Sequence, residues 1–434
     1  MEKLRTALVV GLLCSAWGFG TAHAKEQEPA RAPDGLVVGR LVNNLSRLND
    51  FFPKFTYISV KGGPRNSTHT LSTAPTLPIL KQTTAPFAQL LPPGRYQITE
   101  LEATAGNLFT ESKLPAPALS FEVASGEVVD LGLLLVQPIG AGKAVLVPTD
   151  DPTSVEELLQ TYFPEKTANW SDKPTTRWSG IANWVASPFD YGGTDGQFGG
   201  AVGALITSSI EKGRRLQAQT RWQEAKSAAD YLKIAKTATM ALSEPAVSAE
   251  GTMYFGSILG QVQRRALDGT WTQIDIGRLT EVSAVELLDD QTLLVGTEDG
   301  WLLQQKTPAD EFTVVRRFAP ATRILDLQRW SNGAWLVTTR GPQVKGTAPT
   351  RIYGGNSIAE IDTAVPLKTL RDDATPAASA GKYFVGIAGV EAHIYDSTSA
   401  TWSAPGPQES GPATDRKQFR LGAAQYEAAA DLHG

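Results

Sequence analysis

The feature that most constrains this fold is a short pattern that recurs in the second half of the chain. Its two clearest copies lie at residues 251–257 and 291–297, 40 positions apart. Each copy is an apolar run that ends on Gly-Ser or Gly-Thr, followed by a glycine turn and then a more polar run. Repetition at this period predicts one small antiparallel sheet that is used several times.

Further copies extend the pattern on both sides. The turns that precede the second strand of each copy are at Gly200, Gly251, Gln291, Gly333 and Gly381. The predicted second strands are residues 204–208, 253–257, 293–297, 335–339 and 383–387. Aromatic residues are expected to open the outermost strands, at Trp222, Trp271, Phe312, Trp402 and, in the fourth copy, Ile352-Tyr353. Repeated four-stranded sheets protect their edges by radial arrangement, so we expect a β-propeller over residues 170–405. It would have five blades, or six if residues 143–184 supply another.

Residues 35–139 carry a different pattern, in which apolar residues alternate with polar ones. The predicted strands are residues 36–42, 55–60, 88–91, 96–101, 119–123 and 128–136. Pro92-Pro93-Gly94 and Ser125-Gly126 are turn sequences between them. Alternation with period two buries one face of each strand, which favours an immunoglobulin-like β-sandwich.

Two family resemblances accompany these patterns. The run Leu91-Pro-Pro-Gly-Arg-Tyr-Gln-Ile98 and the hairpin over residues 121–132 resemble transthyretin-like, carboxypeptidase-regulatory-type β-sandwiches. That resemblance implies adhesion, spacing or folding support. The repeats are similar to the broad YVTN, WD-repeat and kelch class of propellers, although no Trp-Asp pair ends a blade and the kelch double-glycine pattern is absent. The second resemblance therefore implies a fold and not a substrate.

One or two short helices are expected in this mainly β chain. In the linker of residues 140–169, a helix is predicted over residues 154–163, because apolar residues recur at helical spacing behind Thr153 and Ser154, each with a glutamate three positions later. Pro164 should end it. A second helix is predicted over residues 223–236, between two blades. Residues 406–434 are expected to form a loose C-terminal tail.

The N-terminus has the pattern of a secretory signal. A charged start, an apolar run over residues 7–19 and Ala22-His23-Ala24 predict cleavage after Ala24, followed by a tether over residues 25–34. The chain is therefore expected to be periplasmic or secreted. Cleavage would remove Cys14, the only cysteine. No later apolar run is long enough to span a bilayer, and the net charge of −5 without a basic stripe argues against nucleic acid as a partner.

The segment of residues 170–200 is rich in aromatic residues and glycine. Trp178, Trp184 and Tyr191 could stack on a ligand, with Asp190 as a polar contact. The alternative is that the tryptophans belong to the core of a blade.

No catalytic constellation is predicted. After the signal only His69, His393 and His433 remain, and they are far apart in the sequence. We therefore expect no catalytic residue, metal site or cofactor. Two hypotheses remain: an exported, non-enzymatic interaction protein that binds an envelope or extracellular protein, or a carbohydrate-binding or glycosidase-like propeller protein that binds glycan.

Overall fold

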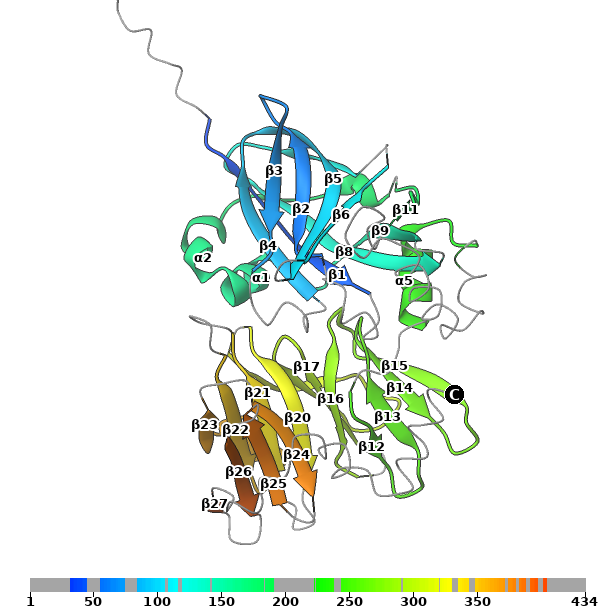
Figure 1. Cartoon of the computed structure of the whole chain (residues 1–434), viewed down its shortest axis with the longest axis vertical. Coiled ribbons are helices and arrows are strands. Elements are labelled where there is room, and N and C mark those ends of the chain that lie inside the picture. The colour runs from blue at the N-terminus through cyan, green and yellow to red at the C-terminus, as the bar shows by residue number, and fades with distance from the viewer. Residues whose placement is uncertain are drawn as a thin grey trace, which may run out of the picture.

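The described part of the chain is mainly β, with two packed sheets near the N-terminus and four separate four-stranded sheets after them (Figure 1). The computed structural model describes residues 32–44, 55–74, 84–105, 108–115, 119–140, 143–182, 184–190, 222, 224–237, 243–289, 292–319, 321–329, 335–342, 348–370, 374–379, 382–387, 391–396 and 401–403. The predicted signal and the C-terminal tail lie outside these residues, as does the first repeat copy up to residue 221. In the described part, no helix is long and apolar enough to cross a membrane.

The first sheet has the strand order β11-β9-β8-β1-β4, with β10 also paired to β8. Its strands are β1 (Gly35–Asn43), β4 (Thr84–Leu91), β8 (Val128–Gly140), β9 (Lys143–Thr149), β10 (Thr175–Arg177) and β11 (Phe189–Asp190). Strand β1 runs parallel to β8 and antiparallel to β4. The strand pattern of β1, β4 and β8 is therefore confirmed.

The second sheet has the order β3-β2-β5-β6, with β7 also paired to β5. Its strands are β2 (Tyr57–Gly62), β3 (Ser67–Ser72), β5 (Gly94–Ala105), β6 (Leu108–Lys113) and β7 (Ser120–Val123). Strands β3 and β6 were not predicted, because edge strands such as Ser-Thr-His-Thr-Leu-Ser carry few apolar residues. One apolar core lies between the sheets and includes Leu41, Phe87, Ile98 and Leu134, which are all fully buried.

The turn that carried the sandwich resemblance begins strand β5. Gly94 has a φ of +152°, and Tyr96, two residues later, is buried and donates its hydroxyl to the backbone oxygen of Pro92 at 2.8 Å. The ring of Tyr96 stacks on Phe121 from β7. The Pro-Gly-x-Tyr pattern thus ties the start of β5 to β7 and to its own turn.

The first sheet continues beyond the predicted boundary at residue 139. Strands β8 and β9 form a hairpin, and β10 and β11 add residues 175–177 and 189–190 to the same sheet. Gly140, the first residue of the predicted linker, pairs with Lys143 in that hairpin. Residues 175–177 and 189–190, assigned above to the propeller, therefore belong to the first sheet instead. We call the two sheets with the helices that follow β9 the N-terminal unit.

Two consecutive helices follow β9. Helix α1 (Val155–Tyr162) begins after Ser154, whose hydroxyl accepts a hydrogen bond from the amide of Glu157 at 3.1 Å, as the capping pattern predicts. Pro164 ends α1 but also begins α2 (Pro164–Trp170), because proline fits the first helical position, where no amide hydrogen is needed. Leu158 and Leu159 anchor α1 against β1. A 3₁₀ turn over Ser179–Ile181 follows β10.

Four antiparallel sheets, each a meander of four strands, follow in chain order. Their strands are β12 (Ala246–Val247) to β15 (Trp271–Asp275), with β13 (Met253–Gly256) and β14 (Gln261–Arg265); β16 (Val282–Leu287), β17 (Leu293–Thr297), β18 (Trp301–Gln305) and β19 (Thr313–Arg317); β20 (Arg323–Arg329), β21 (Trp335–Arg340), β22 (Thr350–Gly355) and β23 (Lys368–Leu370); and β24 (Ala374–Ser379), β25 (Lys382–Ile387), β26 (Glu391–Asp396) and β27 (Thr401–Ser403). We call them the repeated sheets.

Consecutive repeated sheets meet along their first two strands. Strand β16 contacts β12 and β13, and β20 contacts both β16 and β17. The glycine of the repeated motif makes this approach possible. A Cβ on Gly256 would lie 2.1 Å from the Val282 oxygen of the next sheet, and one on Gly296 would lie 2.4 Å from the Ile324 side chain of the sheet after that. Close packing between sheets thus requires glycine at the end of the apolar run in these two copies.

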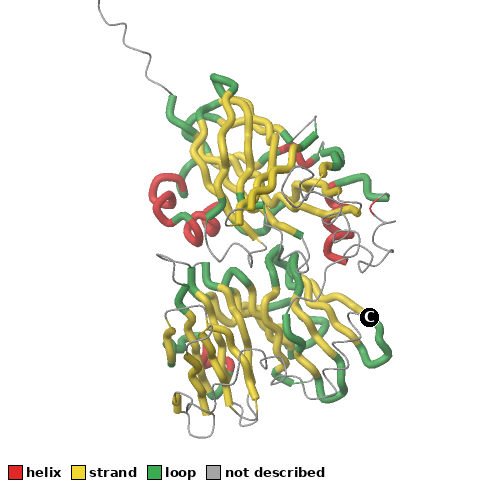
Figure 2. Tube along the Cα trace, in the orientation of Figure 1, coloured by secondary structure: helices red, strands yellow, loops and turns green. Residues whose placement is uncertain are grey.

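Two parts of the repeat interpretation are wrong. Ile352 and Tyr353 lie in the third strand, β22, and the outermost strand of that sheet, β23, has no aromatic residue. Trp222 opens no strand but stacks on Tyr231 of α5 (Ala228–Thr237). Helix α5 confirms most of the predicted second helix, but it packs against β9 of the N-terminal unit. In Figure 2, α5 lies beside the N-terminal unit, and the short α6 (Ile358–Ile361) lies among the repeated sheets.

Candidate functional site at the junction of the two parts

The aromatic residues predicted to bind a ligand lie in the N-terminal unit. Trp178 is buried in the core between its sheets and donates its indole N–H to the Ser120 oxygen at 2.8 Å. Trp184 is also buried, packs edge-on against Tyr231 and donates to the Leu146 oxygen at 3.1 Å. Both rings therefore follow the core alternative, although the core is that of the N-terminal unit and not of a blade.

The other two predicted contacts are separate from these rings. Asp190 is exposed and forms an ion pair with Lys143 across β11 and β9, with 2.6 Å between the charged atoms. Tyr191 lies outside the described residues. Among the described residues of this segment, Trp178 and Trp184 are buried and Asp190 is paired with Lys143, so the structure does not bring these three together as a site. In the described part of the chain, no group of three or more His, Cys, Asp or Glu side chains could hold a metal ion.

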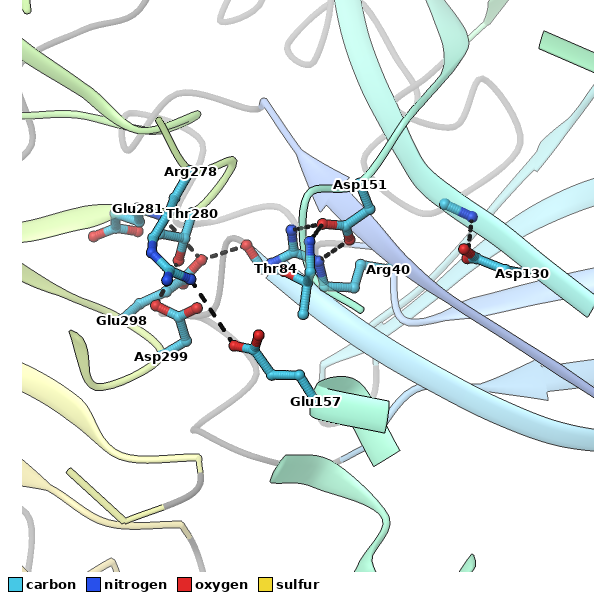
Figure 3. A network of polar contacts seen from close by, with 12 residues as sticks. Arg40, Thr84, Asp130, Asp151, Glu157, Arg278, Thr280, Glu281, Glu298 and Asp299 are labelled. Carbon is cyan, nitrogen blue, oxygen red and sulfur yellow. Dashed lines mark hydrogen bonds and ion pairs between the residues drawn. The ribbon is translucent and has the colours of Figure 1, made fainter. Parts of the chain in front are cut away.

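The strongest concentration of charged groups lies where the N-terminal unit meets the repeated sheets (Figure 3). Arg40 comes from the middle of β1 and is 2% exposed. Its guanidinium donates two hydrogen bonds to the carboxylate of Asp151, one of them at 2.6 Å. Burial alone would lower the pKa of Arg40, but the charge and hydrogen bonds of Asp151, together with the charge of Asp299, raise that pKa, so the guanidinium stays charged.

A buried side-chain hydrogen bond joins the N-terminal unit directly to the repeated sheets. Thr84, at the start of β4, donates its hydroxyl to the carboxylate of Glu298, which follows β17. The two residues are 214 positions apart in the sequence. Both are buried, so this hydrogen bond to a charged group fixes how the end of β17 lies against β4.

Glu298 also belongs to a buried triad in the repeated sheets. Arg323, at the start of β20, donates to Glu281 and lies 3.7 Å from a carboxylate oxygen of Glu298. The amide of Glu281 donates to Glu298 at 3.3 Å, and the amide of Glu298 donates to the Glu281 backbone oxygen at 3.0 Å. Burial would lower the pKa of Arg323, yet the two carboxylates raise it. The Arg323 guanidinium thus links the start of β20 to the residue before β16 and the residue after β17 in the neighbouring sheet.

A third contact joins α1 to the repeated sheets. Trp301 begins β18, and the guanidinium carbons of Arg278 and Arg317 lie 3.7 Å and 4.6 Å from its ring centroid. Glu157 of α1 reaches both arginines, and Arg317 also donates to the Thr161 hydroxyl at 2.7 Å. Glu157 is the glutamate three positions after Ser154 in the predicted capping pattern, but its carboxylate contacts these arginines.

Tyr162, at the end of α1, is a titratable group of the junction that interacts with the Asp299 and Glu298 carboxylates. Its pKa is raised well above the ordinary value, first by burial and then by the nearby Asp299 and Glu298 carboxylates. Asp299 itself accepts hydrogen bonds from the hydroxyls of Thr280 at 3.0 Å and Thr297 at 2.6 Å. A neutral phenol therefore persists beside the acids at any physiological pH.

These residues were not predicted as a site. The only sequence signal was Arg40 itself, a single charge inside the apolar run Leu-Val-Val-Gly-Arg-Leu-Val. Such a residue needs a buried partner, but the sequence does not name it. Chemically, the acids of the junction are matched with arginines or hydroxyls, which suits a structural connection and a binding surface.

Comparisons with known proteins assign no family. No protein-family model matches the chain, and no curated protein matches it. Among solved structures, the computationally designed Ika8 and Ika4 proteins are each 15% identical with a TM-score of 0.27; each alignment covers 36% of this chain, and 46% of Ika8 or 91% of Ika4. An extracellular domain assigned to a hybrid two-component system of B. thetaiotaomicron is 14% identical with a TM-score of 0.28, over 39% of this chain and 23% of that one. This chain thus spans less than half the length of two of the three.

Proposed function

We propose that this chain is an exported, non-enzymatic binding protein, in which an immunoglobulin- or transthyretin-like sandwich holds a five-bladed propeller in a fixed orientation. A sixth blade from residues 143–184 is excluded, because β9 and β10 of that segment pair with β8 in the first sheet. Its partner is a protein of the periplasm, the envelope or the extracellular space. The observation that carries the proposal is the junction, where Thr84 of the N-terminal unit donates to the buried Glu298 carboxylate and Glu157 of α1 pairs with Arg278 and Arg317 of the repeated sheets. A rigid scaffold of this kind loses little conformational freedom when it binds.

Two features support the propeller within this proposal. The repeated sheets contact one another in chain order through their first strands, as neighbouring blades do around a central axis. Their glycine turns are also equivalent in structure: Gly260 and Gly300 have φ values of +71° and +87°, and their backbone oxygens accept the amides of Ile276 and Phe318, each at 2.9 Å. One local solution is therefore repeated from sheet to sheet.

Export is tested by the mature N-terminus. The full chain is expressed with a C-terminal tag in a bacterial host, and the tagged protein of the envelope fraction is analysed by mass spectrometry. We expect a chain that begins at Lys25. A variant without residues 1–24 should stay in the cytoplasm. A tagged chain that still carries residues 1–24 in the cytoplasm of the cells would contradict export.

Binding is tested with the same material. The mature protein is crosslinked in envelope extracts, each crosslinked protein is identified, and its direct binding is measured with purified components. The variant retained in the cytoplasm provides the control for capture after lysis. Saturable binding of a purified envelope protein supports the proposal. Hydrolysis of glycan or peptide substrates without any saturable protein partner would refute it.

A further inference from the structure

The contact between α1 and Trp301 resembles an anion-binding site that is already filled, because a carboxylate lies beside two arginines. Two guanidinium groups lie over the same indole ring, and one carboxylate, that of Glu157, serves both. Its oxygen lies 3.2 Å from Arg317 and 3.9 Å from Arg278. Burial lowers the pKa of Arg278, and the charge of Arg317 lowers it further, while Asp299 and Glu157 raise it. The arginine pair therefore favours an anion beside it.

Glu157 is not needed to hold its own helix. The N-terminal amide of α1 is capped by the Ser154 hydroxyl, and the helix is anchored by the buried side chains of Leu158 and Leu159. A rotation of the Glu157 side chain would therefore expose both guanidinium groups while α1 stays in place. The site is open to solvent, since the side chains of Glu157, Arg278 and Arg317 are 22%, 27% and 34% exposed.

We propose that Arg278, Trp301 and Arg317 form a recognition site for the carboxylate side chains of an acidic protein segment, and that Glu157 occupies this site while the partner is absent. This inference rests on the proposed binding function and names the chemistry of the partner. The charge of Asp299 beside Arg278 favours a singly charged carboxylate over a doubly charged phosphate. The bound partner would displace Glu157, and its own carboxylate would accept hydrogen bonds from the two guanidinium groups.

The test measures the binding of a fluorescein-labelled oligoglutamate peptide to the mature full chain by fluorescence anisotropy. Glu157→Gln removes the internal competitor, and Glu156→Gln is the matched control, since it removes the same charge from the same helical turn. Glu156 is exposed, and its carboxylate accepts a hydrogen bond from the Gln160 side chain of the same helix at 2.9 Å. A partly exposed ion pair is worth little, so we expect Glu157→Gln to bind the peptide about two- to fivefold more tightly than the unsubstituted chain. Glu156→Gln should bind like the unsubstituted chain.

The arginine side is tested with Arg317→Gln, which should weaken peptide binding about tenfold because a charge-assisted hydrogen bond is lost. Arg317→Lys keeps the charge but loses the planar guanidinium. Its affinity for the peptide should therefore lie between those of Arg317→Gln and the unsubstituted chain. Equal affinities of the Glu157→Gln and Glu156→Gln variants would overturn the inference, as would tighter binding of a phosphoserine peptide than of oligoglutamate. A crosslinked envelope partner that binds the Arg317→Gln variant with unchanged affinity would also overturn it, while leaving the proposed function intact. If peptide binding depends on Glu157 but no envelope partner is found, the carboxylate site stands and the proposed function is refuted.

Discussion

Arg323 offers the sharpest test of how the junction is stabilised. Its side chain is 9% exposed, and it faces the carboxylates of Glu281 and Glu298, whose side chains are 2% and 4% exposed. Arg323→Met keeps most of the side-chain volume but leaves both acids without this guanidinium. Removing one partner of a buried ion pair costs about 3–5 kcal/mol, because the remaining charge stays desolvated. We expect a loss of that size in the free energy of unfolding of the repeated sheets.

The assay is urea unfolding together with calorimetric melting, since the two parts of the chain need not unfold together. For a unit of 150–250 residues, each 1 kcal/mol shifts the melting temperature by about 2–4 °C, so Arg323→Met should lower that transition by about 6–20 °C. Arg329→Met is the matched control. It lies at the other end of the same strand, is exposed, and should change stability by no more than about 0.5 kcal/mol.

A triple variant distinguishes lost charge balance from lost packing. Replacing Glu281 and Glu298 by glutamine in the Arg323→Met background removes the unpaired charges but keeps their shapes and hydrogen-bond acceptors. It should recover most of the stability. The reasoning would be refuted if Arg323→Met matched Arg329→Met, or if the triple variant were less stable than the single one.

Three further predictions concern a turn, a core ring and a titrating group. Gly260→Ala should destabilise the chain by about 2 kcal/mol more than Gly269→Ala in urea unfolding: both glycines have positive φ, but only at Gly260 would a Cβ meet a backbone oxygen, at 1.7 Å, whereas nothing lies within 4 Å of one at Gly269. Trp178→Ala truncates a core ring, so it should lower the free energy of unfolding by about 3–5 kcal/mol in the same assay. A variant as stable as the unsubstituted chain would contradict the burial of this ring. Tyr162 has a raised pKa in the folded chain, so its contribution is complete below the ordinary value near pH 10 and is lost as pH rises further. Relative to Tyr162→Phe, the unsubstituted chain should lose up to about 1.4 kcal/mol per pH unit above pH 10, and parallel stability curves would refute this.

Much of the local structure was predictable because it depends on neighbouring residues. The glycine turns at Gly260 and Gly300, the Ser154 cap and the alternation of β1 and β8 each follow from a few adjacent side chains. The second strands at residues 253–257, 293–297 and 335–339 were found from the same pattern and lie in β13, β17 and β21. Turn conformation, capping and period-two burial are short-range properties, so one sequence determines them.

The placement of these elements was decided by contacts between distant residues. Arg40 and Asp151 are 111 positions apart, and Thr84 and Glu298 are 214 apart, so no spacing rule connects them. Trp178 enters the N-terminal core because β10 pairs with β8, a choice that its own neighbours do not dictate. The sequence by itself determined most core strands and their turns, though not edge strands such as β3 and β6, because local sterics and alternation are short-range properties. Only the tertiary structure decided which buried charges meet, because each such charge requires a partner but any complementary residue could supply it.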